Sequence, residues 1–308
     1  MEFKYDMSRD YRPIPPGEQG LLSVTAEKFF LVHRDRPKRL EGTTFDKNGD
    51  MYFTSNYTGR VYKLDMKTLE LKVVWEDAET RPASVKLHRD GRMFISCLAG
   101  EKSGRLVMAD PDGKTMDVLV EGCDIDDVAF DAEGYMYYTQ FSGTVYNPTG
   151  GVYRFTPDMK EQECFIPHLC GPNGIAFSTD YSVMWVTEFT AGRVLRIPMN
   201  NVGLGTVVYH TTGYFGPDSC EVDADDNLYV CMFNQGRVVI LNRDGYPCGQ
   251  ILMPNREVGH NLCGAHATVK PGTRDCYIAC SDDNGNEGSW IMKAPAFAEG
   301  CRTAFNLT

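Results

Sequence analysis

The sequence predicts an all-β protein, a six-bladed β-propeller with four-stranded blades around a central channel. One pattern recurs six times along the 308 residues: a small or acidic residue, an apolar anchor four positions later, a polar turn, and two strand-like runs, the second often led by Gly-Arg. Successive copies begin 42 to 47 residues apart, the length of a four-stranded blade. Asp-Gly and Asn-Gly pairs between the runs are typical of β-hairpins. No segment has a long 3.6-residue hydrophobic period, so helices should be few.

The six copies give the predicted blades in chain order. They begin at Glu41, Ala83, Asp126, Asn173, Asp218 and, in degenerate form, Ala265, with anchors at Phe45, Leu87, Phe130, Phe177, Val222 and Val269. We place the propeller at residues 40–308 as a single domain, and residues 1–39 as an N-terminal segment that packs on the propeller or closes the ring. Two runs compete to supply the closing strand, Phe29–Val32 and Thr303–Asn306, and the sequence leaves that choice open.

Composition excludes several classes of partner. The net charge of −11 argues against nucleic acid or an anionic membrane surface, because both require a basic face. No run approaches the roughly 18 apolar residues of a membrane span. The charged N-terminus lacks the apolar segment of a secretory signal. Eleven cysteines without a Cys-x-x-Cys pair indicate buried, reduced thiols and a cytoplasmic location, with a Cys220–Cys231 disulfide as the less favoured alternative.

Residues at equal phase in the six innermost strands should meet in one ring around the channel. The first residues of the six copies provide three carboxylates, one carboxamide and two alanines. Carboxylates crowded together away from water repel one another unless a cation lies between them. The predicted metal ligands are Glu41, Asp126, Asn173 and Asp218. Hard oxygen donors without His or Cys favour calcium or magnesium over zinc, and a broad channel suits calcium.

The same residues carry a family resemblance. Leu40-Glu41-Gly42, Ile125-Asp126-Asp127, Pro172-Asn173-Gly174 and Gly216-Pro217-Asp218-Ser219 resemble the signatures of the gluconolactonase-like, senescence-marker-protein family of calcium-dependent propeller lactonases, closest to its drug-responsive lactonase subgroup. The resemblance covers residues 38–295. It implies that Glu41, Asp126, Asn173 and Asp218 hold one catalytic calcium, for which magnesium, manganese or zinc could substitute, with Ser219 as an extra ligand. It also implies that Asp218 transfers the proton. The subgroup's second, structural calcium is not expected, because residues 120–125 form too short a loop.

The hypothesis that follows is a metal-dependent hydrolase that opens a small lactone or ester, with Asp218 as the catalytic base. A bound ion lowers the basicity of a ligating carboxylate. Either the metal holds Asp218 loosely, or metal-bound water is the nucleophile, and the sequence does not choose. His260, His266 and Tyr146 are candidates for substrate binding, and the loop Ser281–Asn286 for the rim of the pocket. The acidic run Asp223–Asn227 lacks the glycine and glutamate of a calcium-binding loop, so a hairpin turn is expected.

Other functions remain open at this point. The same ligand set would serve an organophosphate (phosphotriester) hydrolase, because an activated water attacks either electrophile. It would also serve a biosynthetic isomerase or cyclase. A non-catalytic propeller that binds partners on its faces is the alternative of another class, and it requires no charged ring.

Overall fold

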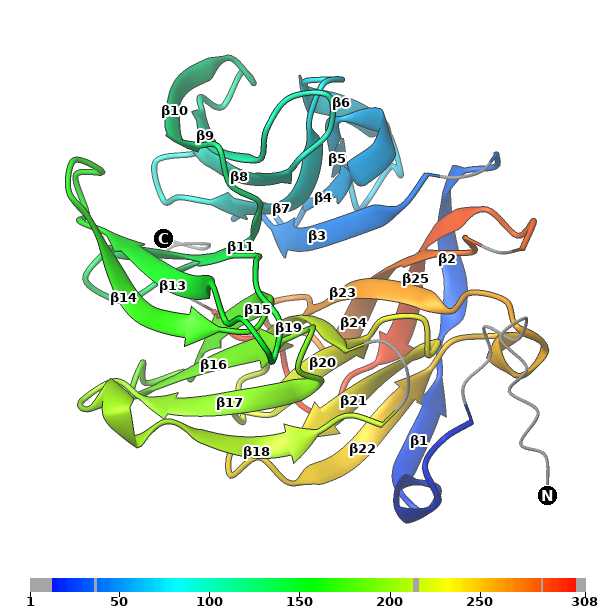
Figure 1. Cartoon of the computed structure of the whole chain (residues 1–308). Coiled ribbons are helices and arrows are strands. Elements are labelled where there is room, and N and C mark those ends of the chain that lie inside the picture. The colour runs from blue at the N-terminus through cyan, green and yellow to red at the C-terminus, as the bar shows by residue number, and fades with distance from the viewer. Residues whose placement is uncertain (1–12, 36–37, 213–215, 284, 303–308) are drawn as a thin grey trace.

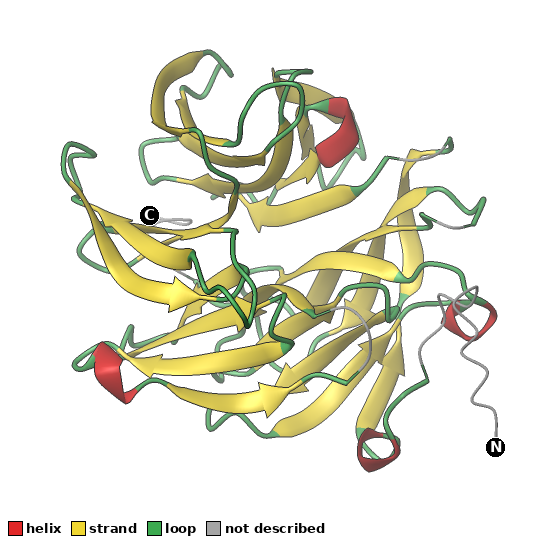
Figure 2. Cartoon of the chain, in the orientation of Figure 1, coloured by secondary structure: helices red, strands yellow, loops and turns green. Residues whose placement is uncertain are grey.

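Short β-branched and aromatic runs, separated by tight polar turns, fold into six antiparallel sheets arranged as the blades of a propeller (Figure 1). The computed structural model describes residues 13–35, 38–212, 216–283 and 285–302. Within these residues the only helices are four 3₁₀ turns, Pro16–Glu18, Asn56–Thr58, Val202–Leu204 and Arg256–Val258 (Figure 2). The predicted fold class, a six-bladed propeller with few helices, is confirmed.

The first five blades each use four strands that are consecutive in the sequence. Blade one consists of β3 (Leu40–Phe45), β4 (Met51–Ser55), β5 (Arg60–Leu64) and β6 (Leu71–Glu76). Blade two consists of β7 (Arg81–Leu87), β8 (Met93–Leu98), β9 (Arg105–Ala109) and β10 (Thr115–Glu121). Blade three consists of β11 (Ile125–Phe130), β12 (Met136–Gln140), β13 (Gly150–Phe155) and β14 (Gln162–Leu169). Blade four consists of β15 (Pro172–Phe177), β16 (Val183–Glu188), β17 (Arg193–Pro198) and β18 (Thr206–His210). Blade five consists of β19 (Pro217–Val222), β20 (Leu228–Met232), β21 (Arg237–Leu241) and β22 (Pro247–Leu252).

An N-terminal strand completes the sixth blade. Three strands come from the C-terminal region, β23 (Cys263–Val269), β24 (Asp275–Ser281) and β25 (Ser289–Pro295). The fourth and outermost is β2 (Glu27–His33), which pairs antiparallel with β25. The predicted Phe29–Val32 run lies in β2, whereas the competing Thr303–Asn306 run lies outside the described residues. A further strand, β1 (Leu22–Thr25), pairs parallel with β22 at the outer edge of blade five.

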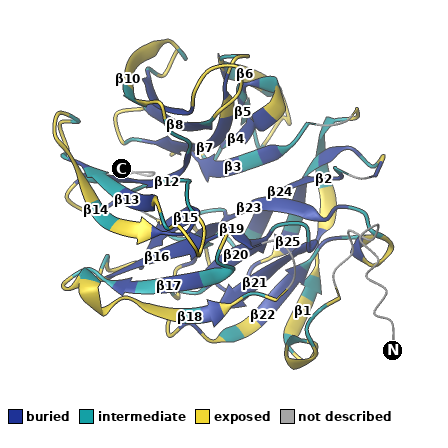
Figure 3. Ribbon diagram, in the orientation of Figure 1, coloured by how far each residue is buried: buried dark blue, intermediate teal, exposed yellow. Residues whose placement is uncertain are grey.

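The first strand of each blade contacts the first strand of the next, so these six strands surround the axis. Burial follows this order: the inner strands are buried, and the outer strands, such as β10, β14 and β18, are largely exposed (Figure 3). The apolar residues form six clusters, one between each pair of neighbouring blades. Each fully buried Val, Leu, Ile or Phe side chain contributes about 1.5–3 kcal/mol of burial free energy. The clusters therefore hold the ring closed through its blade interfaces.

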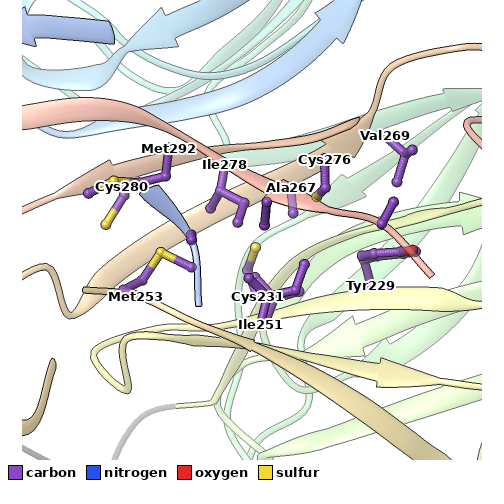
Figure 4. Packing of buried hydrophobic residues seen from close by; sticks show 14 of the residues in the cluster. Tyr229, Cys231, Ile251, Met253, Ala267, Val269, Cys276, Ile278, Cys280 and Met292 are labelled. Carbon is purple, nitrogen blue, oxygen red and sulfur yellow. The ribbon is translucent and has the colours of Figure 1, made fainter. Parts of the chain in front are cut away.

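The cysteines follow the prediction of buried, reduced thiols for the most part. Cys231, Cys276 and Cys280 pack with Met253 and Ile278 in the cluster between blades five and six (Figure 4). Cys220 and Cys231 are both buried and both free, so the alternative disulfide is wrong. No helix among the described residues is long and apolar enough to cross a membrane. The cytoplasmic location stays a prediction.

The turn between β19 and β20 resolves the question of the acidic run Asp223–Asn227. The Asp223 carboxylate accepts the backbone N–H groups of Asp225 and Asn227, each at 3.0 Å. It also accepts the Tyr229 hydroxyl at 3.0 Å. Asp223 is fully buried, and both of its carboxylate oxygens accept hydrogen bonds within this turn and from Tyr229. The predicted hairpin turn is confirmed.

Candidate active site

A β-bulge occurs at the predicted ring position of all six inner strands. The pairing of each inner strand with the second strand of its blade shifts there by an extra residue. The ring residue lies inside the bulge in five blades, and Glu41 lies at its edge in blade one. A bulge bends the strand and redirects a side chain, which is why bulges are frequent next to active sites. The bulges therefore set the direction of the ring side chains.

Two glycines allow neighbouring bulges to approach each other. A Cβ atom on Gly42 would lie 2.4 Å from the Cα of Ser84, and the φ angle of Gly42 is +37°. A Cβ atom on Gly174 would lie 2.7 Å from the Cα of Ser219. Both distances are impossible for real atoms, so only glycine fits beside the ring residues Glu41 and Asn173.

Three hydroxyls on second strands link the bulges from one blade to the next. Each hydroxyl donates to the backbone carbonyl of the ring residue in the following blade. The pairs are Ser96 with Asp126, Thr139 with Asn173, and Thr187 with Asp218. Each hydroxyl also accepts a bulge N–H of its own blade, from Ser84, Asp127 and Gly174 respectively. A hydroxyl has one donor and two acceptor sites, so it can satisfy both groups. Because a bulge interrupts the ladder, these bonds replace the missing backbone pairing.

The ring places three carboxylates where they repel one another. Burial, followed by the neighbouring Asp218 carboxylate, raises the pKa of Glu41 to about 8. Burial also raises the pKa of Asp218 to about 7, opposed by the positive charge of Arg39 and by a hydrogen bond from Asn173. Burial, then Asp218 and Glu41, raises the pKa of Asp126 well above its usual range. Asp218 thus repels the carboxylates of Glu41 and Asp126, and the charge of Arg39 only partly opposes the rise in the pKa values of Glu41 and Asp218.

The fourth ring residue supplies an unused oxygen. Asn173 is 4% exposed, and its Oδ1 atom has no hydrogen-bond partner. A buried amide oxygen without a partner is costly, and hard cations such as calcium accept such oxygens as ligands. The donor set therefore fits a hard divalent cation. Within the described residues, no three His, Cys, Asp or Glu side chains form a ready metal cluster, so metal binding stays a prediction.

An arginine that the sequence did not predict as a site residue, Arg39, lies next to the ring. Arg39 ion-pairs with Asp283, its Nη2 lying 2.5 Å from an Asp283 oxygen, and its guanidinium lies over the rings of Phe233 and Tyr57 at 4.8 and 5.5 Å. Its charge lowers the pKa of both Glu41 and Asp218, whereas that of Asp283 raises the pKa of Glu41. The available signal was the position of Arg39 immediately before Leu40-Glu41. Asp283 comes from the Ser281–Asn286 loop that was expected at the rim.

Three phenylalanines form an arc on the face of the ring where the inner strands begin. Phe141, Phe189 and Phe233 each follow the second strand of blades three, four and five. Phe189 meets its neighbours Phe141 and Phe233 edge to face, with centroids 5.9 and 5.7 Å apart. All three are half-buried. The Phe that recurs after the second strand of three blades is visible in the sequence and could have predicted this aromatic arc.

The remaining predicted residues occupy different environments. Ser219 lies beside Asp218 and is 5% exposed. His260 is partly exposed, and its Nδ1 atom lies 2.9 Å from an Asp282 oxygen. His266 is fully buried in β23 with Nδ1 on the Thr43 hydroxyl, and burial lowers its pKa well below the usual value. Tyr146 is 95% exposed. Their roles in ligation and substrate binding stay predictions, and a substrate contact of His266 would require access that its burial does not provide.

The ring of six blades, the bulges of its inner strands and the oxygen donors on them define a class of protein, the six-bladed propellers with an acidic centre. The profile of the SMP-30/Gluconolactonase/LRE-like region matches residues 39–268, and the chain belongs to that family. It is 40% identical over 294 residues to a lactonase, drp35, of Staphylococcus aureus strain MRSA252, which covers 92% of this chain and 90% of the relative. It is 38% identical over 307 residues to the lactonase drp35 of Staphylococcus saprophyticus, with 96% and 94% coverage.

Solved structures of low sequence identity share the fold. Regucalcin of Agrobacterium tumefaciens, a calcium-binding protein, superimposes with a TM-score of 0.71 at 15% identity, over 92% of this chain and 99% of that one. A gluconolactonase of Xanthomonas campestris superimposes with a TM-score of 0.69 at 16% identity, with the same coverage. These similarities support the architecture.

Proposed function

We propose that the protein is a calcium-dependent lactonase that opens a small lactone at the ring of Glu41, Asp126, Asn173 and Asp218, with Ser219 as an additional ligand. The observation that carries the proposal is the convergence of three carboxylates with raised pKa values on a buried amide oxygen without a partner. The relatives named lactonases, which match over nine tenths of the chain, support the reaction class.

When bound, calcium would supply a Lewis acid that polarises the lactone carbonyl. Asp218 accepts a proton from the attacking water and returns it to the ring oxygen as the ester bond breaks, so that a hydroxy acid leaves. In the metal-free chain burial raises the pKa of Asp218 to about 7. A ligated cation would lower that pKa, so Asp218 acts as the base where the metal holds it loosely. The charge of Arg39 favours the ionised form of Asp218, which is the form that can accept the proton.

The surroundings of the ring favour a lactone with an apolar body. The arc of Phe141, Phe189 and Phe233 offers half-buried aromatic surface beside the acidic centre. Aromatic rings bind apolar groups through burial and edge-to-face contacts. A lactone whose carbonyl faces the acidic centre could lay its apolar carbons against this arc.

The test is hydrolysis of three substrates, a γ-lactone with an alkyl side chain, an aldonolactone and a fluorophosphate, measured by acid release at constant pH. Each is assayed with added calcium and with excess chelator. We expect the alkyl γ-lactone to be hydrolysed only with calcium, and more efficiently than the aldonolactone. Preferential hydrolysis of the fluorophosphate would assign the protein to the phosphotriesterases. No hydrolysis of any substrate would favour the isomerase or the binding scaffold.

A further inference from the structure

A cavity of about 700 Å³ lies at the opposite end of the central channel from the acidic ring. The ring is at the beginning of the inner strands, whereas the cavity is lined by their last residues and by the turns that follow them, including Asn48, Thr179 and Pro271. Its size is within the 300–1,000 Å³ typical of sites for small molecules. The proposed lactonase reaction makes no use of it.

An ion pair across the channel separates this cavity from the ring. Lys86 and Glu221 each lie three residues after a ring position, in blades two and five respectively. The Nζ atom of Lys86 lies 3.2 Å from the Oε2 atom of Glu221. Blades two and five are opposite each other in a six-membered ring, so the pair spans the channel. The equivalent residues of blades three and four are Ala129 and Ala176, which line the cavity. The small side chains open the space on that side, and the ion pair closes it towards the ring.

The free charges at the cavity are positive. Lys47, Lys270 and Arg302 line it, and in the described parts of the chain none of them ion-pairs with a carboxylate. The two carboxylates in the lining already have partners, since Asp46 binds Lys63 at 2.9 Å and Glu221 binds Lys86. The chain has a net charge of −11, so a lining in which cations outnumber the unpaired carboxylates has the opposite sign to the chain as a whole. These cations create a local attraction for anions.

The opposite wall of the cavity is apolar. Phe130, Ile175, Phe177 and Val222 line it together with the two alanines. These residues belong to the ends of the inner strands of blades three to five, whereas Lys47 and Lys270 belong to the turns of blades one and six. Sites for small molecules typically combine such an apolar wall with a few polar groups that orient the ligand.

We propose that this cavity is a second binding site, for a small organic carboxylate with an apolar body. The carboxylate lies towards Lys47, Lys270 and Arg302, and the body packs on Phe130 and Phe177. The site does not depend on the lactonase proposal, because the Lys86–Glu221 pair separates it from the acidic ring.

The test is calorimetric titration of 4-phenylbutyrate into the full chain after calcium has been stripped with chelator, so that the acidic ring cannot hold the carboxylate through a metal. The variant is Lys47→Gln with Lys270→Gln, which removes two charges on turns without placing a new group in the core. The control is Lys160→Gln, whose side chain is 78% exposed on the turn before β14. We expect saturable one-to-one binding to the wild type and to the control, and at least tenfold weaker binding to the double variant. The uncharged amide of the same acid should also bind at least tenfold more weakly.

Three results would overturn the proposal: no saturable binding to the wild type, equal binding by the double variant, or equal binding of the amide. Lactone hydrolysis by the double variant with added calcium is a separate measurement. Unchanged hydrolysis shows that the variant is folded, so loss of 4-phenylbutyrate binding is then attributable to the cavity. If the lactonase proposal fails and no hydrolysis is seen, an unchanged thermal midpoint serves as the folding control.

Discussion

The two ends of the channel are built by the same six strands but carry opposite charges. Where the strands begin, the ring residues Asp126, Asn173 and Asp218 lie on bulges and are at most 7% exposed. Where the strands end, the cations of Lys47 and Arg302 lie on exposed segments outside the sheet. Between them the Lys86–Glu221 pair is neutral overall.

The difference lies in how each charge is held. At the beginning of the strands, the hydroxyls of Ser96 and Thr187 donate to the backbone carbonyls of Asp126 and Asp218, which holds the backbone of these buried acids in place. At the other end, long cationic side chains on turns can remain solvated at little cost. A fixed buried acid is stabilised by a counter-cation or by taking up a proton, whereas a solvated cation only attracts an anion. The acidic end is therefore suited to catalysis and the basic end to reversible binding.

The largest expected effect comes from Asp218→Asn, which tests whether the acidic end does the chemistry. The amide keeps an oxygen for calcium but cannot accept a proton, so we expect kcat for lactone hydrolysis to fall by about 10³-fold, within the usual range for a general base. Calcium binding, measured by titration calorimetry, should persist. Asp225→Asn, on the exposed turn of the same blade, is the matched control and should leave kcat unchanged. Full activity of Asp218→Asn would remove Asp218 from the mechanism.

The dependence of the free energy of unfolding on pH should differ between the calcium-free and the calcium-bound protein. Without metal, the raised pKa values of Glu41 and Asp218 mean that the folded state binds more protons than the unfolded chain. This contribution to stability is present below about pH 4 and is lost as the pH rises through about 7 to 8. The chelator-treated protein should thus become less stable as the pH rises from 5 to 8.5, as measured by urea unfolding.

Added calcium should reverse that trend, because it binds the ionised carboxylates. At a hundred times its Kd, a ligand of the folded state adds about 2.7 kcal/mol to the free energy of unfolding. Residual calcium in the chelated sample should be checked by atomic emission, since a very tight ion could resist removal. If a calcium-free sample has the same unfolding midpoint with and without added ion at every pH, the ring does not bind calcium.

The residues of the acidic ring were predictable from the sequence. The repeat has a fixed phase, so residues as distant as Glu41 and Asp218 could be assigned to one ring before any coordinates were known. In the structure the charge of Asp218 raises the pKa of Glu41, as expected of two carboxylates in one ring. The closing strand was ambiguous because Phe29–Val32 and Thr303–Asn306 are both short runs that could supply it. Within the described residues, the pairing of β2 with β25 decides for the first.

The rest depends on contacts that have no periodic signal. The ion pair of Arg39 with Asp283 joins residues 244 positions apart, and the Lys86–Glu221 pair joins blades on opposite sides of the ring. His266 was a candidate for substrate binding, since it follows a ring position by one residue. The bulge at that position places it in the buried wall instead, bonded to Thr43. A shift of one residue reverses the direction of a side chain in a strand, and sequence alone does not place bulges.

A smaller effect is expected from the hydroxyls that support the bulges. Thr187→Val preserves shape but leaves the Asp218 carbonyl and the Gly174 N–H without partners. A buried unsatisfied group costs about 1–3 kcal/mol, so we expect the free energy of unfolding to fall by roughly 2 kcal/mol, together with weaker calcium binding. Thr206→Val, on the exposed strand β18, is the control and should change neither quantity. If the two variants are equally stable and bind calcium equally well, the hydroxyl bonds do not position the ring.

The smallest effect is expected at His260, where the sequence predicts a substrate contact. Asp282 accepts a hydrogen bond from Nδ1 in the tautomer that leaves Nε2 free to accept one from a substrate. His260→Gln keeps a hydrogen-bonding group but loses the fixed ring orientation, so we expect KM for the lactone to rise by up to about tenfold, or about 1.4 kcal/mol, with kcat little changed. His210→Gln, on the exposed strand β18, is the matched control. An unchanged KM would exclude His260 from the substrate site while leaving Asp218 as the base, because a contact that binds substrate and a group that transfers the proton affect different kinetic constants.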